Sequence, residues 1–265
     1  MKHLTKYTQE DMKSISEFNK IVKNYMTMIR ILTASIIILF SFNCFSQYQY
    51  LGSGSSTTKL LLHLNDNSLD ASGNGNNGID SLITYGLAYG KFSQGASFNG
   101  TSSKITIPNK FTSLNRTYSL WFKLGSQTTA GFILCSRTGT TDQGIDILIN
   151  TSNVHGFLNS RIRTDSSINL SDTIAYNLND NNWHNIIFVI NNTTKLFSTY
   201  VDGNFKHSKS YTGTITDSQN LQIGNRSNAS YFNGYLDEFF IENRALTSSE
   251  IKRYYTFSKG FYTNN

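Results

Sequence analysis

The 265-residue sequence has only two cysteines, Cys44 and Cys135, and a single proline. Small exported domains often rely on several disulfides, and two cysteines cannot supply such a framework. Cysteine pairs and two-histidine motifs typical of zinc sites are also absent, which argues against zinc. Cys135 ends the apolar run Phe132–Cys135, so we expect it to be a buried, small hydrophobic side chain rather than a reactive thiol.

Most of the chain also lacks a strong excess of charge. The formal net charge is +6, but residues 1–46 hold six Lys/Arg and three Asp/Glu, which leaves 17 basic and 14 acidic residues for the remainder. The basic residues form no stripe along the sequence. This mild balance argues against nucleic acid as a partner.

The chain has no apolar run long enough to span a bilayer comfortably. The longest run, Ile29 to Phe42, is interrupted by Arg30, follows further basic residues and ends near the small residue Ser46. These features are typical of a secretory signal peptide, which we place at about residues 26–46. We therefore predict a protein that is secreted or held at the cell surface, with no transmembrane segment in the mature chain.

One domain is expected after this segment. We interpret residues 1–46 as an N-terminal extension with the signal peptide, 47–58 as a Gly/Ser/Thr-rich linker, 59–258 as the domain and 259–265 as a tail. Short apolar and alternating segments recur in the domain at the spacing of an all-β sandwich.

Turn and helix signals support that interpretation. His184 to Ile190 is apolar on both faces, as expected of a strand between two layers. The pair Asp202-Gly203 predicts a two-residue hairpin turn. Thr247 and Glu250 form a capping box for a helix of about two turns, which we expect to seal one end of the sandwich.

The closing stretch, Tyr231 to Ile251, is the most informative part of the sequence. Asp237 and Glu238 are neighbours in its strand, so strict alternation predicts one carboxylate on each face, and burying Asp237 is costly unless a cation meets it. Gly234-Tyr-Leu-Asp-Glu-Phe followed by Asn243-Arg-Ala-Leu-Thr-Ser-Ser-Glu-Ile resembles the end of a laminin-G-like, concanavalin A-like jelly-roll domain.

Other segments resemble the same family in the same order. They are Leu60-Leu-Leu-His-Leu, Asp70 to Gly78, Gly95 to Ile107, Trp183-His-Asn-Ile-Ile-Phe-Val and Tyr200-Val-Asp-Gly-Asn. The resemblance runs from about Lys59 to Tyr255. It implies an all-β fold, a two-sheet antiparallel jelly-roll sandwich of the concanavalin A type with one short C-terminal helix.

The resemblance also implies a structural calcium ion. Many family members hold Ca²⁺ where the opening loop meets the closing strand. Carried over to this chain, the ligands are Asp70, Asn74, Gly75 and Asp237, an oxygen-rich set of the kind that calcium prefers. The alternative is that Asp237 only accepts hydrogen bonds from the 70–78 loop and ties the ends of the domain together.

Catalysis is not expected, although glucanases share the fold. Glycosidases place two carboxyl groups about 5–5.5 Å apart for retention or about 6.5–9.5 Å apart for inversion. After residue 46 the only glutamates are Glu238, Glu242 and Glu250. The first two are four strand residues apart, which is roughly 13 Å, and Glu250 belongs to the helix cap. We therefore predict no catalytic residues and no enzymatic activity.

Candidate ligand-binding residues lie in loop-like or polar segments. Lectin sites combine an aromatic platform with polar groups that bond to sugar hydroxyls. Arg161 and Arg163 would face the same way in a strand and could clamp an acidic sugar or a carboxylate. The candidates are Tyr85, Tyr89, Arg161, Arg163, Asp165, Arg226 and Tyr231. The alternative for each is a solvated loop residue.

The resemblance implies a secreted, non-catalytic carbohydrate-binding and adhesion module that binds extracellular or cell-surface glycans. A shared fold is weak evidence for a shared function, so two alternatives stay open. One is a structural adhesin whose ligand is a cell-surface protein. The other is an accessory module of a glycan-degrading, O-glycosyl hydrolase system.

Overall fold

The computed structural model describes residues 10, 13–14, 16–29, 56–126, 129–139, 141–150, 157–166, 169–174 and 178–260. The chain divides into two units, Met1–Gln49 and Tyr50–Asn265. In the first unit, residues 16–29 are helical. The predicted signal peptide lies outside the described residues from residue 30 onward and stays a prediction. Within the described parts, none of the helices is both long and apolar enough to cross a membrane.

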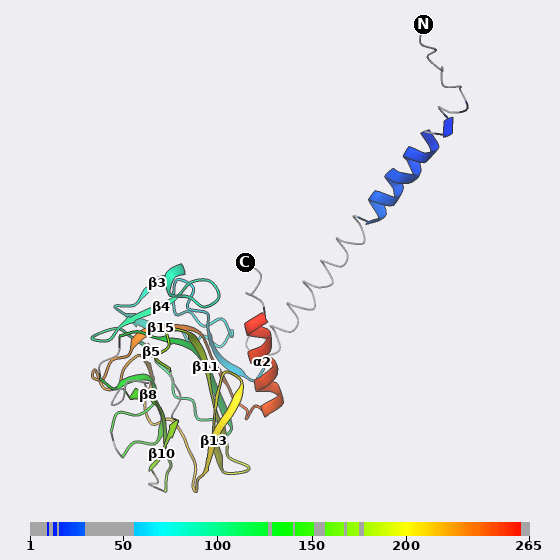
Figure 1. Ribbon diagram of the computed structural model, residues 1–265. Coiled ribbons are helices and arrows are strands. Elements are labelled where there is room, and N and C mark those ends of the chain that lie inside the picture. Colours follow the sequence, from blue (N-terminus) through cyan, green and yellow to red (C-terminus); the bar gives the residue numbers. More distant parts are fainter. Residues whose placement is uncertain are drawn as a thin grey trace. The chain divides into compact units, whose positions relative to one another are not determined.

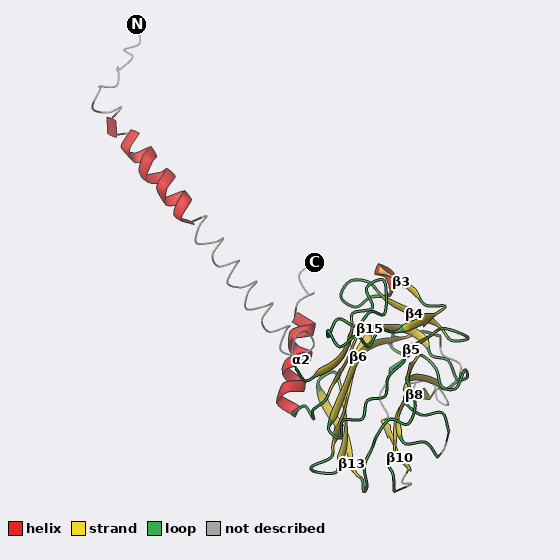
Figure 2. Ribbon diagram, turned by 180° about the vertical axis from the view of Figure 1, so that it is seen from behind, coloured by secondary structure: helices red, strands yellow, loops and turns green. Residues whose placement is uncertain are grey.

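The second unit is built from two antiparallel sheets, as predicted (Figures 1 and 2). The eight-stranded sheet has the order β13 (Asn204–Ser210), β12 (Leu196–Val201), β11 (Trp183–Asn191), β6 (Arg116–Leu124), β15 (Asn233–Glu242), β4 (Gly95–Asn99) and β3 (Thr84–Gly86), with β1 (Thr58–Leu62) also paired to β15. The seven-stranded sheet has the order β10 (Asn169–Ile174), β9 (Phe157–Arg163), β8 (Gly144–Asn150), β7 (Gly131–Cys135), β14 (Leu221–Ile223), β5 (Lys104–Ile107) and β2 (Ile79–Ser81).

The main core lies between the two sheets and follows the period-2 pattern of the strands. Ile186, Phe188 and Ile190 of β11 point into it, opposite strands such as β8, whose Ile145 and Ile147 are also buried there. The other face of β11 carries Ile187 and Val189, which belong to a second apolar cluster. The prediction that β11 is apolar on both faces is confirmed.

The C-terminal helix differs from the expectation in length and position. Helix α2 (Ser248–Gly260) has 13 residues, and it packs on the outer face of the eight-stranded sheet instead of sealing one end (Figure 1). Its Ile251 is fully buried in the second cluster, and Tyr255 stacks on Trp121 of β6 with 5.7 Å between ring centroids. Apolar side chains on the outer face of β11 and β15 explain the position, because a helix must cover them.

The turn and cap signals are confirmed. Asp202 and Gly203 both have positive φ, 52° and 68°, in the hairpin between β12 and β13. Thr247 Oγ1 accepts the amide of Glu250, and the Glu250 carboxylate accepts the amide of Thr247. Strand β1 begins at Thr58, and α2 runs to Gly260.

Candidate ligand-binding site

A β-bulge in β15 overturns the strict alternation expected around the acidic pair. Asp237 faces Trp121 across the ladder, but Phe240 faces Ser119, so one extra residue is accommodated, and Glu238 has a φ of 50°. Phe239 therefore points into the main core, although simple alternation puts it on the same face as Asp237. The bulge leaves Asp237 on the outer face of the eight-stranded sheet, beneath other parts of the chain.

Asp237 is held by a turn that the sequence did not indicate. Its Oδ2 accepts the backbone amides of Lys91 and Phe92 at 2.7 and 3.0 Å. The residue is 1% exposed, and its Oδ1 has no hydrogen-bond partner. Burial raises the pKa of Asp237 to about 7, and the charge of Glu238 adds to this effect.

The 70–78 loop forms a separate arrangement around Asp70. Asp70 Oδ1 accepts the amides of Leu61 and Ser72, and its Oδ2 accepts the amide of Asn76, all at 2.9 to 3.0 Å. Asn74 donates to the Thr58 carbonyl at 2.8 Å. The loop is thereby tied to β1, and β1 in turn pairs with β15.

These bonds bear on the predicted calcium site. Both carboxylate oxygens of Asp70 already accept amides, and the bonds of Asp237 go to the turn at 91–92 instead of the 70–78 loop. Within the described ranges, no group of three or more His, Cys, Asp or Glu is placed to hold a metal ion. These hydrogen bonds thus place Asp70 and Asp237 in two separate arrangements and do not bring the four predicted ligands together. Among the carboxylate oxygens of the predicted ligands, Asp237 Oδ1 is the one without a hydrogen-bond partner, and calcium binding stays a prediction.

The neighbouring glutamates have structural partners. Glu238 meets the ring Nδ1 of His63 at 2.9 Å, and this hydrogen bond raises the pKa of His63 despite the opposing effect of burial. Glu242 is fully buried and accepts the hydroxyl of Thr58 at 2.6 Å. Neither carboxylate lines the pocket described below.

The outer face of the seven-stranded sheet carries a row of polar side chains that crosses five strands. The ladder pairs place these residues side by side: Thr106, Gln222, Cys135, Asp146 and Arg161. Asp146 lies between Cys135 and Arg161 in this row and is fully buried. Its Oδ2 accepts Nε of Arg137 at 2.7 Å, and its Oδ1 accepts the thiol of Cys135 at 3.0 Å.

Cys135 and Arg226 complete the surroundings of Asp146. Cys135 is buried, as predicted, and burial raises the pKa of its thiol well above the ordinary value. The Arg226 guanidinium lies 5.3 Å from the centroid of the Phe132 ring, and its Nη1 is 3.8 Å from Asp146. Two guanidinium groups therefore share one carboxylate.

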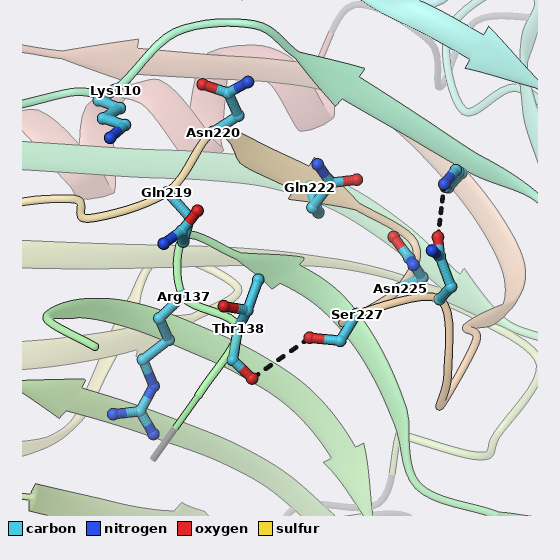
Figure 3. A pocket seen from close by; sticks show the side chains of 10 residues that line it. Lys110, Arg137, Thr138, Gln219, Asn220, Gln222, Asn225 and Ser227 are labelled. Carbon is cyan, nitrogen blue, oxygen red and sulfur yellow. Dashed lines mark hydrogen bonds between the residues drawn. The ribbon is translucent and has the colours of Figure 1, made fainter. Parts of the chain in front are cut away.

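A pocket of about 480 Å³ opens beside this row on the same face (Figure 3). Its lining residues are polar or basic, and none of them is acidic or aromatic: Lys104, Lys110, Arg137, Thr138, Gln219, Asn220, Gln222, Asn225, Ser227 and Asn228. Lys104 and Gln222 alternate with the core residues Ile105 and Ile223, which places the pocket outside the sandwich. In Figure 3, Arg137 extends away from Lys110 and Gln222.

Several polar groups of the pocket already have partners within the protein, among them Gln222 Oε1, which accepts the hydroxyl of Thr106 at 2.9 Å. Lys104 donates to Asn228 Oδ1 at 2.6 Å, and the hydroxyl of Ser227 donates to the Thr138 carbonyl at 3.2 Å. Asn225 is 1% exposed, and its Oδ1 has no hydrogen-bond partner. An unpaired buried acceptor of this kind costs about 1–3 kcal/mol.

Some of the predicted ligand-binding residues lie on this face. Arg161 and Arg163 are partly exposed on either side of the core residue Ile162, so they face the same way, as predicted. The Nη1 of Arg226 lies 3.8 Å from Asp146 on this face, and Tyr231 forms an isolated bridge with Phe132 of β7.

The remaining three candidates have other surroundings. Tyr85 donates to Asp80 at 2.8 Å and packs against the main core. Tyr89, in the short 3-10 helix η1 (Leu87–Tyr89), stacks on Tyr235 with 5.3 Å between ring centroids. Asp165 accepts the amide and hydroxyl of Thr214. The structure therefore does not bring all seven candidates into one site.

Sequence reasoning missed most of the pocket. Its lining residues come from the segments 104–110, 137–138 and 219–228, which only the sheet order β7-β14-β5 brings together. One signal was available, because Lys104 and Thr106 alternate with the apolar Ile105 and Ile107, and this pattern gives an outward polar face.

The family model of the concanavalin A-like lectin/glucanases superfamily matches residues 99–252, which is more than half of the chain. The chain belongs to this superfamily. The predicted family is thus confirmed over residues 99–252, which include the closing segment, and the jelly-roll sandwich is confirmed as well. No curated protein matches the sequence.

Solved structures similar to this superfamily member include binding domains. The binding domain of paraclostridial mosquitocidal protein 1 has a TM-score of 0.61 and 20% identity, over 75% of this chain and 52% of that one. The botulinum neurotoxin serotype D binding domain has a TM-score of 0.60 and 14% identity, over 76% of this chain and 51% of that one. The chain thus spans about half the length of these toxin domains.

A third similar structure is a domain of an enzyme. Domain 4 of AbnA, a GH43 extracellular arabinanase from Geobacillus stearothermophilus, was solved in complex with arabinotriose. It has a TM-score of 0.57 and 22% identity, over 74% of this chain and 97% of that domain. At these identities the likeness concerns the fold.

Proposed function

We propose that the domain is a non-catalytic carbohydrate-binding module of an exported protein and that it binds extracellular or cell-surface glycans in the pocket of the seven-stranded sheet. The observation that carries this proposal is the pocket lining, which is rich in amide and hydroxyl groups. A sugar hydroxyl both donates and accepts hydrogen bonds, and side-chain amides offer an acceptor and two donors each. A concave site with convergent polar groups is the usual form of a small-ligand site.

Asn225 strengthens the case for a hydroxyl-bearing ligand. Its buried Oδ1 lacks a protein donor at the wall of the pocket. A hydroxyl of a bound sugar, or a water molecule that bridges to it, would recover the hydrogen bond that folding leaves unmade.

The absence of catalysis is supported by the charges in the pocket. Glycoside hydrolysis needs two carboxyl groups flanking the scissile bond, and none of the residues lining the pocket is acidic. The carboxylate closest in the row, Asp146, is fully buried and bonded to Arg137 and Cys135. It is therefore not exposed to a substrate.

A second candidate is an accessory module of a glycan-degrading system. It is favoured by the similarity to domain 4 of the arabinanase AbnA, which this chain matches over 97% of that domain. In that case the module would bind the same polysaccharide that a separate catalytic domain cleaves.

The test is a glycan array probed with the purified protein. We expect selective binding that Asn220→Ala and Gln222→Ala each weaken about tenfold, since each removes hydrogen bonds to the sugar. Asn204→Ala, which changes an exposed amide on β13 of the other sheet, serves as the control and should leave binding unchanged.

Three outcomes would count against the proposal. A silent array together with capture of a cell-surface protein would favour the adhesin alternative. Release of reducing sugar from a bound glycan would refute the absence of catalysis. Equal losses in the β13 control and in the pocket variants would place the binding elsewhere.

A further inference from the structure

The charge of the pocket is one-sided. Lys104, Lys110 and Arg137 line it, and no acidic residue does. The recorded partner of the Lys104 ammonium is the neutral amide of Asn228. Lys110 is exposed, and within the described parts of the chain no salt bridge is recorded for either lysine. Both ammonium groups are therefore available to an anion.

The carboxylates around the pocket do not balance these cations. Asp146 is already shared between Arg137 and Arg226. Asp142 accepts the amide and hydroxyl of Thr138 at the rim. Both of these carboxylates are therefore engaged, and neither of them lines the pocket with the two lysines. A cleft lined by one sign of charge concentrates ligands of the opposite sign.

The rest of the lining distinguishes between kinds of anion. Single-stranded nucleic acid is held by aromatic side chains on which bases stack, and none of the lining residues is aromatic. The lining instead places amides such as Asn220 and Gln222 beside the ammonium groups. Amides suit hydroxyls, and ammonium groups form strong charge-assisted bonds to carboxylate or sulfate oxygens.

We infer that the ligand is an acidic glycan whose carboxylate or sulfate groups bind at Lys104 and Lys110 while its hydroxyls bind the neighbouring amides. This inference rests on the proposed glycan-binding function and narrows its substrate class. Arg137 is a positioning residue, because its guanidinium is committed to Asp146 and fixes the loop that carries Thr138.

The experiment compares polysaccharides that differ only in charge. The probes are polygalacturonate against its methyl ester, which isolates the carboxylate, and dextran sulfate against dextran, which isolates the sulfate. A single-stranded oligonucleotide is the third probe. Dissociation constants are measured by titration calorimetry with the purified protein at low and high salt. We expect the charged member of one pair to bind about tenfold tighter or more at low salt, with the advantage shrinking as salt screens it.

Matched lysine variants locate the effect. Lys104→Gln/Lys110→Gln should lose about tenfold in affinity for the charged probe. Lys206→Gln/Lys209→Gln removes the same charge from β13 of the other sheet and should lose less than twofold. If the double pocket variant fails to fold, Lys110→Gln alone, at an exposed position, provides the measurement.

The outcomes separate this inference from the proposed function. Equal affinity for charged and uncharged partners, or equal losses in the two double variants, overturns the acidic specificity. If Gln222→Ala still weakens the binding in that case, the glycan site itself stands. Tighter binding of the oligonucleotide than of either polysaccharide also overturns the inference. Silence of all these probes and of the glycan array refutes both proposals.

Discussion

Replacing Asp237 by asparagine should remove a pH dependence from the stability of the domain. The side chain is buried, only its Oδ2 accepts hydrogen bonds, and its pKa is raised to about 7. The folded protein therefore favours the protonated form more than the unfolded chain does. The resulting stabilisation is fully present below pH ~4, where both states are protonated, and is lost as pH rises through about 7.

The size of the effect follows from the shift. The pKa rises from 3.8 to about 7, and each unit corresponds to about 1.4 kcal/mol. The free energy of unfolding should thus fall by at most about 4 kcal/mol between pH 4 and pH 8.5 on account of this residue. For a domain of this size, about 2–4 °C of melting temperature corresponds to 1 kcal/mol, so the midpoint moves by roughly 8–16 °C.

The assay is urea denaturation of the wild type and of Asp237→Asn at pH 5 and pH 8.5 with a chelator present. His63 and His184 also have raised pKa values and contribute slopes of the same sign, so the difference between the two proteins is the informative quantity. We expect similar stability at pH 5 and a variant that is more stable by up to about 3 kcal/mol at pH 8.5, because about two units separate pH 5 from the folded pKa of about 7 and each unit is worth about 1.4 kcal/mol. Asp165→Asn, at an exposed position, is the control and should follow the wild type over this range.

Two results would refute the reasoning. If wild type and Asp237→Asn keep a constant difference from pH 5 to pH 8.5, the carboxylate is not the source of the pH dependence. Millimolar calcium at pH 8.5 provides the second comparison, because a bound cation would stabilise the ionised wild type and not the variant. If calcium leaves the urea midpoint of the wild type unchanged, the predicted calcium site is refuted.

Three further substitutions test the scaffold. Asp217→Asn should cost about 3–5 kcal/mol in urea denaturation, because it leaves the fully buried Arg116 without its carboxylate, whereas a loss below 1 kcal/mol would show that the pair is dispensable. Thr247→Ala should cost about 1 kcal/mol through loss of the helix cap, and an unchanged melting temperature would contradict that role. Gly224→Ala should cost about 2 kcal/mol or more, since φ is +87° and the added Cβ would collide with Phe98; a variant that melts like the wild type would show that this backbone relaxes freely.

Local signals predicted the parts of the fold that depend on neighbouring residues. The apolar strand β11, the Asp202-Gly203 turn and the Thr247 cap each rest on fewer than ten consecutive residues, and all three are present. The bulge at Glu238 carries no such signal, because nothing in the sequence marks a glutamate for a positive φ. The extra residue of the bulge reverses which of the following residues point into the core. Alternation alone therefore puts Phe239 on the wrong face.

The candidate site was less predictable, since it depends on which strands become neighbours. Lys104, Arg137 and Asn225 are far apart in sequence and meet because β14 lies between β5 and β7. Arg161 and Arg163 were placed on one face from their spacing alone, and this was confirmed because a strand fixes direction locally. Asp146 pairs with Arg161 across the ladder but belongs to another strand, and its ion pair with Arg137 could be seen only in the structure.

Helix α2 makes the two outer faces of the sandwich unequal. It covers the outer face of the eight-stranded sheet (Figure 1), whereas the pocket opens on the outer face of the seven-stranded sheet. Chemical immobilisation through an exposed helix residue such as Lys252 would therefore hold the protein with its pocket turned toward the solution. Attachment through the helix would thus orient the protein on a sensor surface, which would also serve the binding measurements.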